Sequence, residues 1–247
     1  MTNRRPSSQF SVISLILSLL GLVLLPLMLL NPPPSVVVLP WQTQLIGFAF
    51  MIICILGIIA GISPSHCSIK RKKRNQSQKE IAVQIDSPQT KSIRKEGHHP
   101  TCDHYSGHVI TIKGSFYCAG CSGLVTGAII AIIGTILFYF LSFPIVYTEA
   151  TFWLGFVFVT IGLLQHPLYQ LLKLNRGIIR FIINILFVVG SFLLLTSLIQ
   201  LTNNLILAIY LLLLILYWIF TRIVMSRRSH HLICSRCNRP ECPYSEA

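Results

Sequence analysis

Residues 98–134, "HHPTCDHYSGHVITIKGSFYCAGCSGLVTGAIIAIIG", join a cluster of histidines and cysteines directly to a long apolar run. Because a helix needs about 20 mostly apolar residues to cross a bilayer, the run that starts at Ser122 predicts a membrane-spanning helix. Histidine and cysteine side chains are the usual protein ligands of zinc. The stretch therefore predicts a metal-binding module at the end of a membrane span.

The rest of the chain has the composition of a membrane protein. Hydrophobic residues make up 53% of the 247 residues and charged residues only 11%, whereas about 25% are charged in an average soluble domain. Six apolar stretches are long enough to cross a bilayer. They cover about 11–30, 43–62, 122–143, 149–171, 178–200 and 203–225. The sequence predicts an all-α polytopic membrane protein with six transmembrane helices and a small β-hairpin. A cleaved signal peptide is the alternative for the first stretch, because Arg4 and Arg5 precede it.

The positive charge of the chain predicts its orientation. Lys and Arg total 20, whereas Asp and Glu total 7. If the chain crosses six times, all the basic residues fall on one side, and the opposite loops carry only Glu149. Basic loops face the cytoplasm. We therefore expect a multi-pass protein of the cell membrane with both termini in the cytoplasm.

The same distribution indicates the partners of the basic segments. The run "KRKKR", Lys70 to Arg74, follows the second span and is expected to lie near anionic headgroups. Nucleic-acid binding is not expected, because orientation already explains the excess of basic residues.

Five regions follow from these features. Residues 1–62 form a helical hairpin, 63–97 a basic, disordered cytoplasmic linker, 98–121 a Cys/His module, 122–225 a four-helix membrane region, and 226–247 a cytoplasmic Cys/His tail.

The first module offers four ligands in two pairs, Cys102 with His104 and Cys118 with Cys121. The intervening "VITIKGSFY" alternates apolar and polar residues around a Lys-Gly pair, which predicts a β-hairpin. A hairpin brings its two flanks together, so the four ligands can form a tetrahedral site for structural Zn²⁺. A redox pair and unmetallated thiols are the alternatives, and other nearby histidines compete with His104.

The tail contains a second set of ligands, His230, Cys234, Cys237 and Cys242. They predict either a second zinc site or additional ligands for the first module. The expected cofactor is therefore one zinc ion, or two if the tail forms its own site.

The predicted spans contain few polar groups. Gln165 and His166 are the main ones, and we expect interhelical hydrogen bonds from them near the cytoplasmic side. No Asp or Glu lies inside a span and no catalytic motif is present, so the sequence predicts no enzyme activity. Trp41, Trp153 and Trp218 are expected at the membrane interfaces.

Small residues predict where helices approach closely. Gly57 and Gly61 lie four residues apart in the second span, and Gly123 and Gly127 lie four apart in the third. Such stripes admit a neighbouring backbone. We expect the second and third spans to pack together through them, with homodimerisation as the competing use.

The stretch "CAGCSGLVTGAII" resembles a motif in an uncharacterised family of small prokaryotic membrane proteins. In that family C-x-x-C, Ser or Thr, and Gly open a transmembrane helix, as Cys118, Cys121, Ser122 and Gly123 do here. A later Gln and an Asn/Arg pair also resemble the family, at Gln165 and at Asn175 and Arg180. The resemblance, over about residues 102–190, implies the architecture and no particular activity.

Together these features predict a non-enzymatic membrane component whose cytoplasmic zinc modules form a docking or regulatory surface for a protein partner. The first alternative is a thiol-disulfide relay that uses Cys118 and Cys121 at a helix N-terminus. The second is a transporter of a small neutral or lipid-like solute, because the spans lack the charges that an ion path requires.

Overall fold

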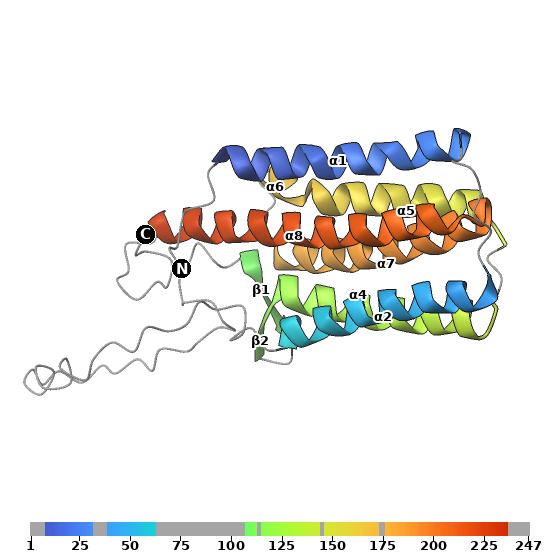
Figure 1. The fold of residues 1–247 in the computed structure, drawn as a ribbon. Helices are drawn as coiled ribbons and strands as arrows, with labels where there is room; N and C mark the ends of the chain where they lie inside the picture. Colours follow the sequence, from blue (N-terminus) through green and yellow to red (C-terminus); the bar gives the residue numbers. More distant parts are fainter. Residues whose placement is uncertain are drawn as a thin grey trace, which may run out of the picture.

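The computed structural model describes residues 8–31, 39–62, 107–112, 115–143, 146–172 and 176–236. These residues form a bundle of helices with a small two-stranded sheet at one end (Figure 1). The elements are α1 Ser8–Leu30, α2 Pro40–Ile62, β1 Val109–Ile112, β2 Ser115–Cys118, α4 Ala119–Thr135, the π-helix η3 Ile136–Phe140, α5 Thr148–Leu163, α6 Gln165–Leu172, α7 Gly177–Thr202 and α8 Leu205–Arg236. The predicted linker, residues 63–97, lies outside the described residues.

Five helical segments in the described part of the chain are long and apolar enough to cross a membrane: Gln9–Leu30, Trp41–Ile62, Ala119–Phe140, Gly177–Thr202 and Leu205–His230. The expected span at 149–171 differs, because it consists of α5 and α6 with a break at Leu164. Pro167 explains this break. Its ring nitrogen cannot donate to the carbonyl of Leu163, and its ring crowds that carbonyl. The prediction of a predominantly helical fold is confirmed, and five helices of the described residues, instead of the expected six, are long and apolar enough to cross a membrane.

The last helix is longer than the sequence analysis predicted. We expected it to end near residue 225, but α8 continues to Arg236. No Gly or Pro interrupts the chain between Leu205 and Pro240, so nothing in the sequence stops the helix. Its 32 residues correspond to about 48 Å at 1.5 Å per residue, against about 30 Å for the hydrocarbon core. The first part of the predicted tail is therefore helical and extends the bundle.

The helices pack in a defined order around α7. This helix lies between α4 and α5, and α2 covers the other side of α4. The first and last helices, α1 and α8, also contact each other. Figure 1 shows that the start of α1, the hairpin, α6, the start of α7 and the end of α8 lie at the same end of the bundle. We call this end the basic end, because it contains Arg176, Arg180, Arg222, Arg227, Arg228 and Arg236.

The glycines of α2 and α4 face different neighbours. An added Cβ at Gly61 would lie 2.6 Å from Val125 Cγ2, and one at Gly57 would lie 3.9 Å from Leu124 Cδ2. Both glycines of α2 therefore face α4, in agreement with the expected pairing of these helices.

The glycines of α4, in contrast, face α7 instead of α2. An added Cβ at Gly123 would collide with the backbone oxygen of Phe181, and one at Gly127 would lie 3.1 Å from Ile185 Cα. The expectation that both stripes meet is therefore wrong. The stripe of α4 is used inside this chain, where it lets the backbones of α4 and α7 approach.

A polar contact joins α1 to α8. The Thr221 hydroxyl lies 2.7 Å from that of Ser14 and 2.8 Å from that of Ser18, and all three residues are buried. Trp218 Nε1 donates to the backbone oxygen of Ser18 at 3.1 Å, and its side chain is fully buried. Trp218 therefore packs between α1 and α8, and its indole N–H has a partner inside the bundle; its depth in a membrane stays a prediction.

The predicted hairpin is confirmed as an antiparallel pair of strands. Val109 pairs with Cys118, and Ile112 pairs with Ser115 next to the turn. The second strand leads directly into α4, because Cys118 is the extended N-cap residue of that helix. At the start of α7, a Cβ on Gly177 would collide with the backbone oxygen of Val109. The hairpin therefore lies against the first turn of α7, and Gly177 makes this approach possible.

Candidate functional site at the basic end

The basic end gathers the charged side chains of the described residues. Its six arginines come from α7, α8 and the residue before α7, and no lysine lies in the described ranges. Glu149 is the single acidic residue in these ranges, and it lies in the first turn of α5 at the opposite end. The described part of the basic end therefore carries positive charge without a carboxylate.

Arg222 joins three helices. Its Nη2 donates to Gln165 Oε1 at 2.5 Å and to Asn184 Oδ1 at 2.6 Å. Its guanidinium also lies over the Phe187 ring, 4.3 Å from the centroid, where a cation–π contact is favourable. The Nη1 atom is covered and has no hydrogen-bond partner among the described residues. Arg222 is thus held by neutral groups alone.

Arg180 links the hairpin to α7. Its Nη1 lies 3.3 Å from His108 Nδ1. Because a guanidinium has only donors, Nδ1 must accept, and the proton of the neutral ring is on Nε2. The guanidinium also lies over the Tyr169 ring at 4.4 Å from the centroid. Its Nε is covered and, within the described ranges, has no hydrogen-bond partner.

The two arginines belong to one cluster. Asn184 accepts from Arg222, and its Nδ2 donates to the backbone oxygen of Arg180 at 2.6 Å. Both guanidinium charges act on the Tyr169 hydroxyl and on the His166 ring. We define the arginine cluster as Arg180, Arg222, the residues that contact them and His166, on which their charges act; the contacting residues are His108, Gln165, Tyr169, Asn184 and Phe187.

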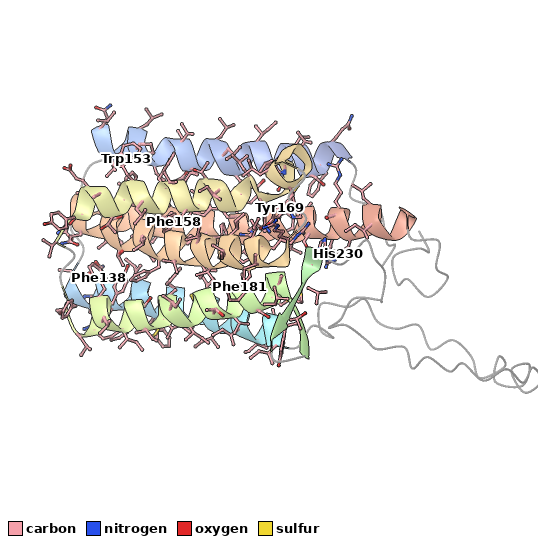
Figure 2. All side chains as sticks on the ribbon, turned by 180° about the vertical axis from the view of Figure 1, so that it is seen from behind. Phe138, Trp153, Phe158, Tyr169, Phe181 and His230 are labelled. Carbon is pink, nitrogen blue, oxygen red and sulfur yellow. The ribbon has the colours of Figure 1, made fainter. Side chains whose placement is uncertain are left out.

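The histidines of the hairpin and of α8 lie beside this cluster. The ring centroids of His108 and His230 are 5.6 Å apart, and the charge of His230 also acts on His166. Figure 2 shows nitrogen-bearing side chains between the labelled Tyr169 and His230, at the end of the bundle that carries the hairpin. The cluster therefore lies where α6, α7, α8 and β1 meet.

The predicted metal ligands are only partly described. Cys118 and Cys121 are reduced thiols of intermediate exposure at the start of α4, and the Cys118 side chain lies near enough to Arg180 to interact with its charge. Cys102 and His104 lie outside the described residues. In the described ranges, no three His, Cys, Asp or Glu side chains could hold a metal ion.

The second predicted metal site is also incomplete. His230 lies on α8 beside His108, whereas Cys237 and Cys242 lie outside the described residues. Cys234 lies in the last turns of α8, and its side chain is not among those described. The zinc sites remain predictions.

Gln165 and His166 lie in the arginine cluster, and Gln165 forms the expected interhelical hydrogen bond. The sequence analysis gave no partner for Gln165 and did not single out Arg222. The sequence contains an indication of this partner. "IFTRIVM", residues 219–225, places Arg222 between apolar residues, and a charge in such a position usually has a partner inside the bundle.

No family model, no curated protein and no solved structure matches this chain. The function must therefore be inferred from the residues and their arrangement.

Proposed function

We propose that the protein is an integral membrane component with six crossings and that its cytoplasmic end carries a structural zinc module that serves as a docking or regulatory surface. The exposed apolar side chains support insertion in a bilayer. Leu20, Leu56 and Leu213, for example, are 56%, 60% and 61% exposed on three different helices. Apolar side chains that are exposed to this extent on several helices are unfavourable in water and favourable in lipid.

The sixth crossing is α5 together with α6. The 16 residues of α5 extend about 24 Å, which is less than the thickness of a typical hydrocarbon core. The eight residues of α6 follow α5 after the break at Leu164. An even number of crossings agrees with Figure 1, in which α1 begins and α8 ends on the same side. The arginines on that side favour a cytoplasmic location for it.

The observation that carries the zinc proposal is the way the hairpin is held. In the observed register Cys118 lies opposite Val109, so the chain that leads into β1 enters beside the Cys118-x-x-Cys121 pair. Cys102 and His104 precede β1 by only a few residues. Four such ligands satisfy tetrahedral zinc and leave no open position for catalysis.

The contacts of the hairpin support a regulatory role. Val109 lies against Gly177, and His108 is hydrogen-bonded to Arg180. Metal binding or a protein partner at the hairpin would therefore act directly on the start of α7. The predicted ligand His230 lies on α8 beside His108, so a second zinc site with Cys234, Cys237 and Cys242 would begin next to the same surface.

Elemental analysis of the purified protein tests the zinc site. We expect at least one zinc per chain, and one fewer in Cys118→Ser. Cys54→Ser is the matched control, because Cys54 is a buried thiol of α2 and its loss should leave the zinc content unchanged. Chelation should accelerate amide hydrogen exchange in the hairpin while the helices stay protected. A wild-type protein with well under one zinc per chain would contradict the proposal.

A thiol-disulfide relay is the second candidate, and the location of Cys118 and Cys121 favours it. Both thiols are reduced at the N-terminus of α4, where a helix dipole favours a thiolate, and Cys118 lies near enough to Arg180 to interact with its charge. One thiolate would attack a disulfide of a soluble partner. The other would then resolve the mixed disulfide, which reduces the partner and oxidises the pair.

Trapping distinguishes this candidate from the zinc proposal. In Cys121→Ser the mixed disulfide cannot be resolved if Cys118 attacks first, so a covalent complex should accumulate that a reducing agent dissolves. Cys54→Ser serves as the control and should trap nothing. If a zinc ion is bound and no complex forms, the relay is excluded.

A further inference from the structure

We propose that the arginine cluster is a binding site for a phosphate group and that Arg180 and Arg222 are its ligands. This inference does not depend on the zinc module or on the relay, because it uses residues of α7 and α8 and a different chemistry.

The first argument is charge. Asn184 links Arg180 to Arg222, both guanidinium charges act on His166 and Tyr169, and the described residues of the basic end contain no carboxylate to balance them. Arginine stays protonated under all physiological conditions, so the positive charge cannot be removed by loss of a proton. A buried charge requires a counter-charge. An anion at this position would supply it.

The second argument is the supply of donors. Arg222 directs one nitrogen, Nη2, to Gln165 and Asn184, and Arg180 directs Nη1 to His108. Arg222 Nη1 and Arg180 Nε have no hydrogen-bond partner within the described ranges. Buried donors in folded proteins are normally satisfied by protein, water or a bound ion.

The third argument is shape. The two guanidinium groups come from different helices, and each offers a planar fork of donors. A tetrahedral oxyanion can accept hydrogen bonds from two forks in different planes, whereas a single carboxylate offers two oxygens in one plane. Both side chains are of intermediate exposure, and each keeps a covered nitrogen without a hydrogen-bond partner among the described residues.

The fourth argument is depth. Arg222 follows the first residue of α8, Leu205, by 17 positions, which is about 26 Å along the helix axis. A span that starts at Leu205 therefore places Arg222 near the inner boundary of a hydrocarbon core about 30 Å thick. Lipid phosphates lie at this depth, and basic pockets between helices on the cytoplasmic side are known to bind lipid headgroups. The same chemistry would accept a soluble phosphate from the cytoplasm.

Thermal unfolding in nanodiscs tests the site and separates the two sources. The protein is placed in discs of phosphatidylcholine alone, and its melting temperature is measured with inorganic phosphate or with chloride at equal ionic strength. A second arm uses discs that contain phosphatidylglycerol and no added phosphate. We expect a higher melting temperature in at least one arm. A rise with inorganic phosphate indicates a soluble ligand, and a rise with phosphatidylglycerol alone indicates a lipid headgroup.

Variants show whether the arginines are responsible. Arg222→Gln and Arg180→Gln should each lower the affinity for the effective phosphate on the order of tenfold or more, since a hydrogen bond to a charged group contributes about 1.5–3 kcal/mol. Arg227→Gln is the matched control, because it removes the same charge from an exposed position on α8. The Arg227→Gln variant should keep the affinity of the wild type for the effective phosphate. If a glutamine variant does not fold, Arg222→Lys keeps the charge without the planar fork and should also bind more weakly.

Two results would overturn the proposal. One is that neither arm changes the melting temperature of the wild type. The other is that Arg227→Gln lowers the response to phosphate as much as Arg222→Gln does.

Discussion

Substituting alanine for Gly57 and for Gly123 should change stability in opposite directions, although both belong to Gly-x-x-x-Gly patterns. At Gly57 an added Cβ meets Leu124 Cδ2 at 3.9 Å, an ordinary van der Waals contact. Alanine also favours a helix over glycine by about 1 kcal/mol. The free energy of unfolding of Gly57→Ala should therefore rise by up to about 1 kcal/mol.

At Gly123 the added carbon would collide with the backbone oxygen of Phe181 and would lie 2.9 Å from Asn184 Cβ. Backbone atoms cannot relieve the collision by a change of rotamer, so α4 and α7 must move apart. Such overpacking of a helix interface lowers the free energy of unfolding by about 1–3 kcal/mol. The shift also disturbs Asn184, which accepts a hydrogen bond from Arg222, and loss of that bond adds about 1.5–3 kcal/mol. After the gain in helix propensity of about 1 kcal/mol, we expect the free energy of unfolding to fall by about 1.5–5 kcal/mol.

The assay is reversible unfolding by sodium dodecyl sulfate in mixed micelles, followed by far-ultraviolet circular dichroism. Gly61→Ala gives an intermediate case, because its Cβ would lie 2.6 Å from Val125 Cγ2, a side-chain atom that can move. The expected order of stability is Gly57→Ala, Gly61→Ala, Gly123→Ala. Equal losses at Gly57 and Gly123, or no loss at Gly123, would refute the assignment of α4's stripe to the α7 interface.

Three further predictions follow from the polar contacts and the topology. Thr221→Val removes the hydroxyl that contacts Ser14 and Ser18 and should lower the free energy of unfolding by about 1 kcal/mol. Thr202→Val is the control in the same assay. Its effect should be nearly neutral, because the Thr202 hydroxyl contacts the Leu198 carbonyl of its own helix. Gln165→Leu leaves Arg222 without one acceptor and should lower the free energy of unfolding by about 1.5–3 kcal/mol. Gln165→Glu should keep the stability of the wild type and weaken the response to phosphate. Equal stability of the two variants would argue against the contact between Gln165 and Arg222. In intact cells a membrane-impermeant maleimide should label Glu149→Cys and leave the wild type unlabelled, since every native cysteine is expected in the cytoplasm or the membrane; external labelling of the wild type would disprove six crossings with cytoplasmic termini.

The sequence predicted those elements whose formation depends on local patterns. The hairpin follows from the alternation on either side of Lys113 and Gly114, and the observed register pairs Val109 with Cys118. The long apolar runs predicted the helices because length and hydropathy are properties of a continuous segment. Hydropathy placed the end of α8 too early, near residue 225 instead of Arg236. The reason is that hydropathy indicates where the apolar part of a helix ends and not where its backbone hydrogen bonds end.

The arginine cluster could not be assembled from local patterns. Arg222 contacts Gln165 and Asn184, which are 57 and 38 residues away in the sequence, and only the packing of α6, α7 and α8 brings them together. Sequence analysis identified Gln165 as polar and buried but gave no partner for it. Likewise, a glycine stripe predicts which face of a helix admits a close neighbour but does not predict which helix that neighbour is. For Gly123 the neighbour is α7. Trp218 shows the same limit, because a tryptophan near a span end is buried once α1 packs against α8.

The contact between the first and last helices has a consequence for biosynthesis. Ser14 and Thr221 are separated by 207 residues, and a ribosome that adds about 5–20 residues per second needs about 10–40 s to make that length. If α1 enters the bilayer as it is made, Ser14 and Ser18 lack the Thr221 hydroxyl during this interval, which is unfavourable for polar groups in hydrocarbon. The native contacts of α1 with α8 therefore form only after α8 has been made.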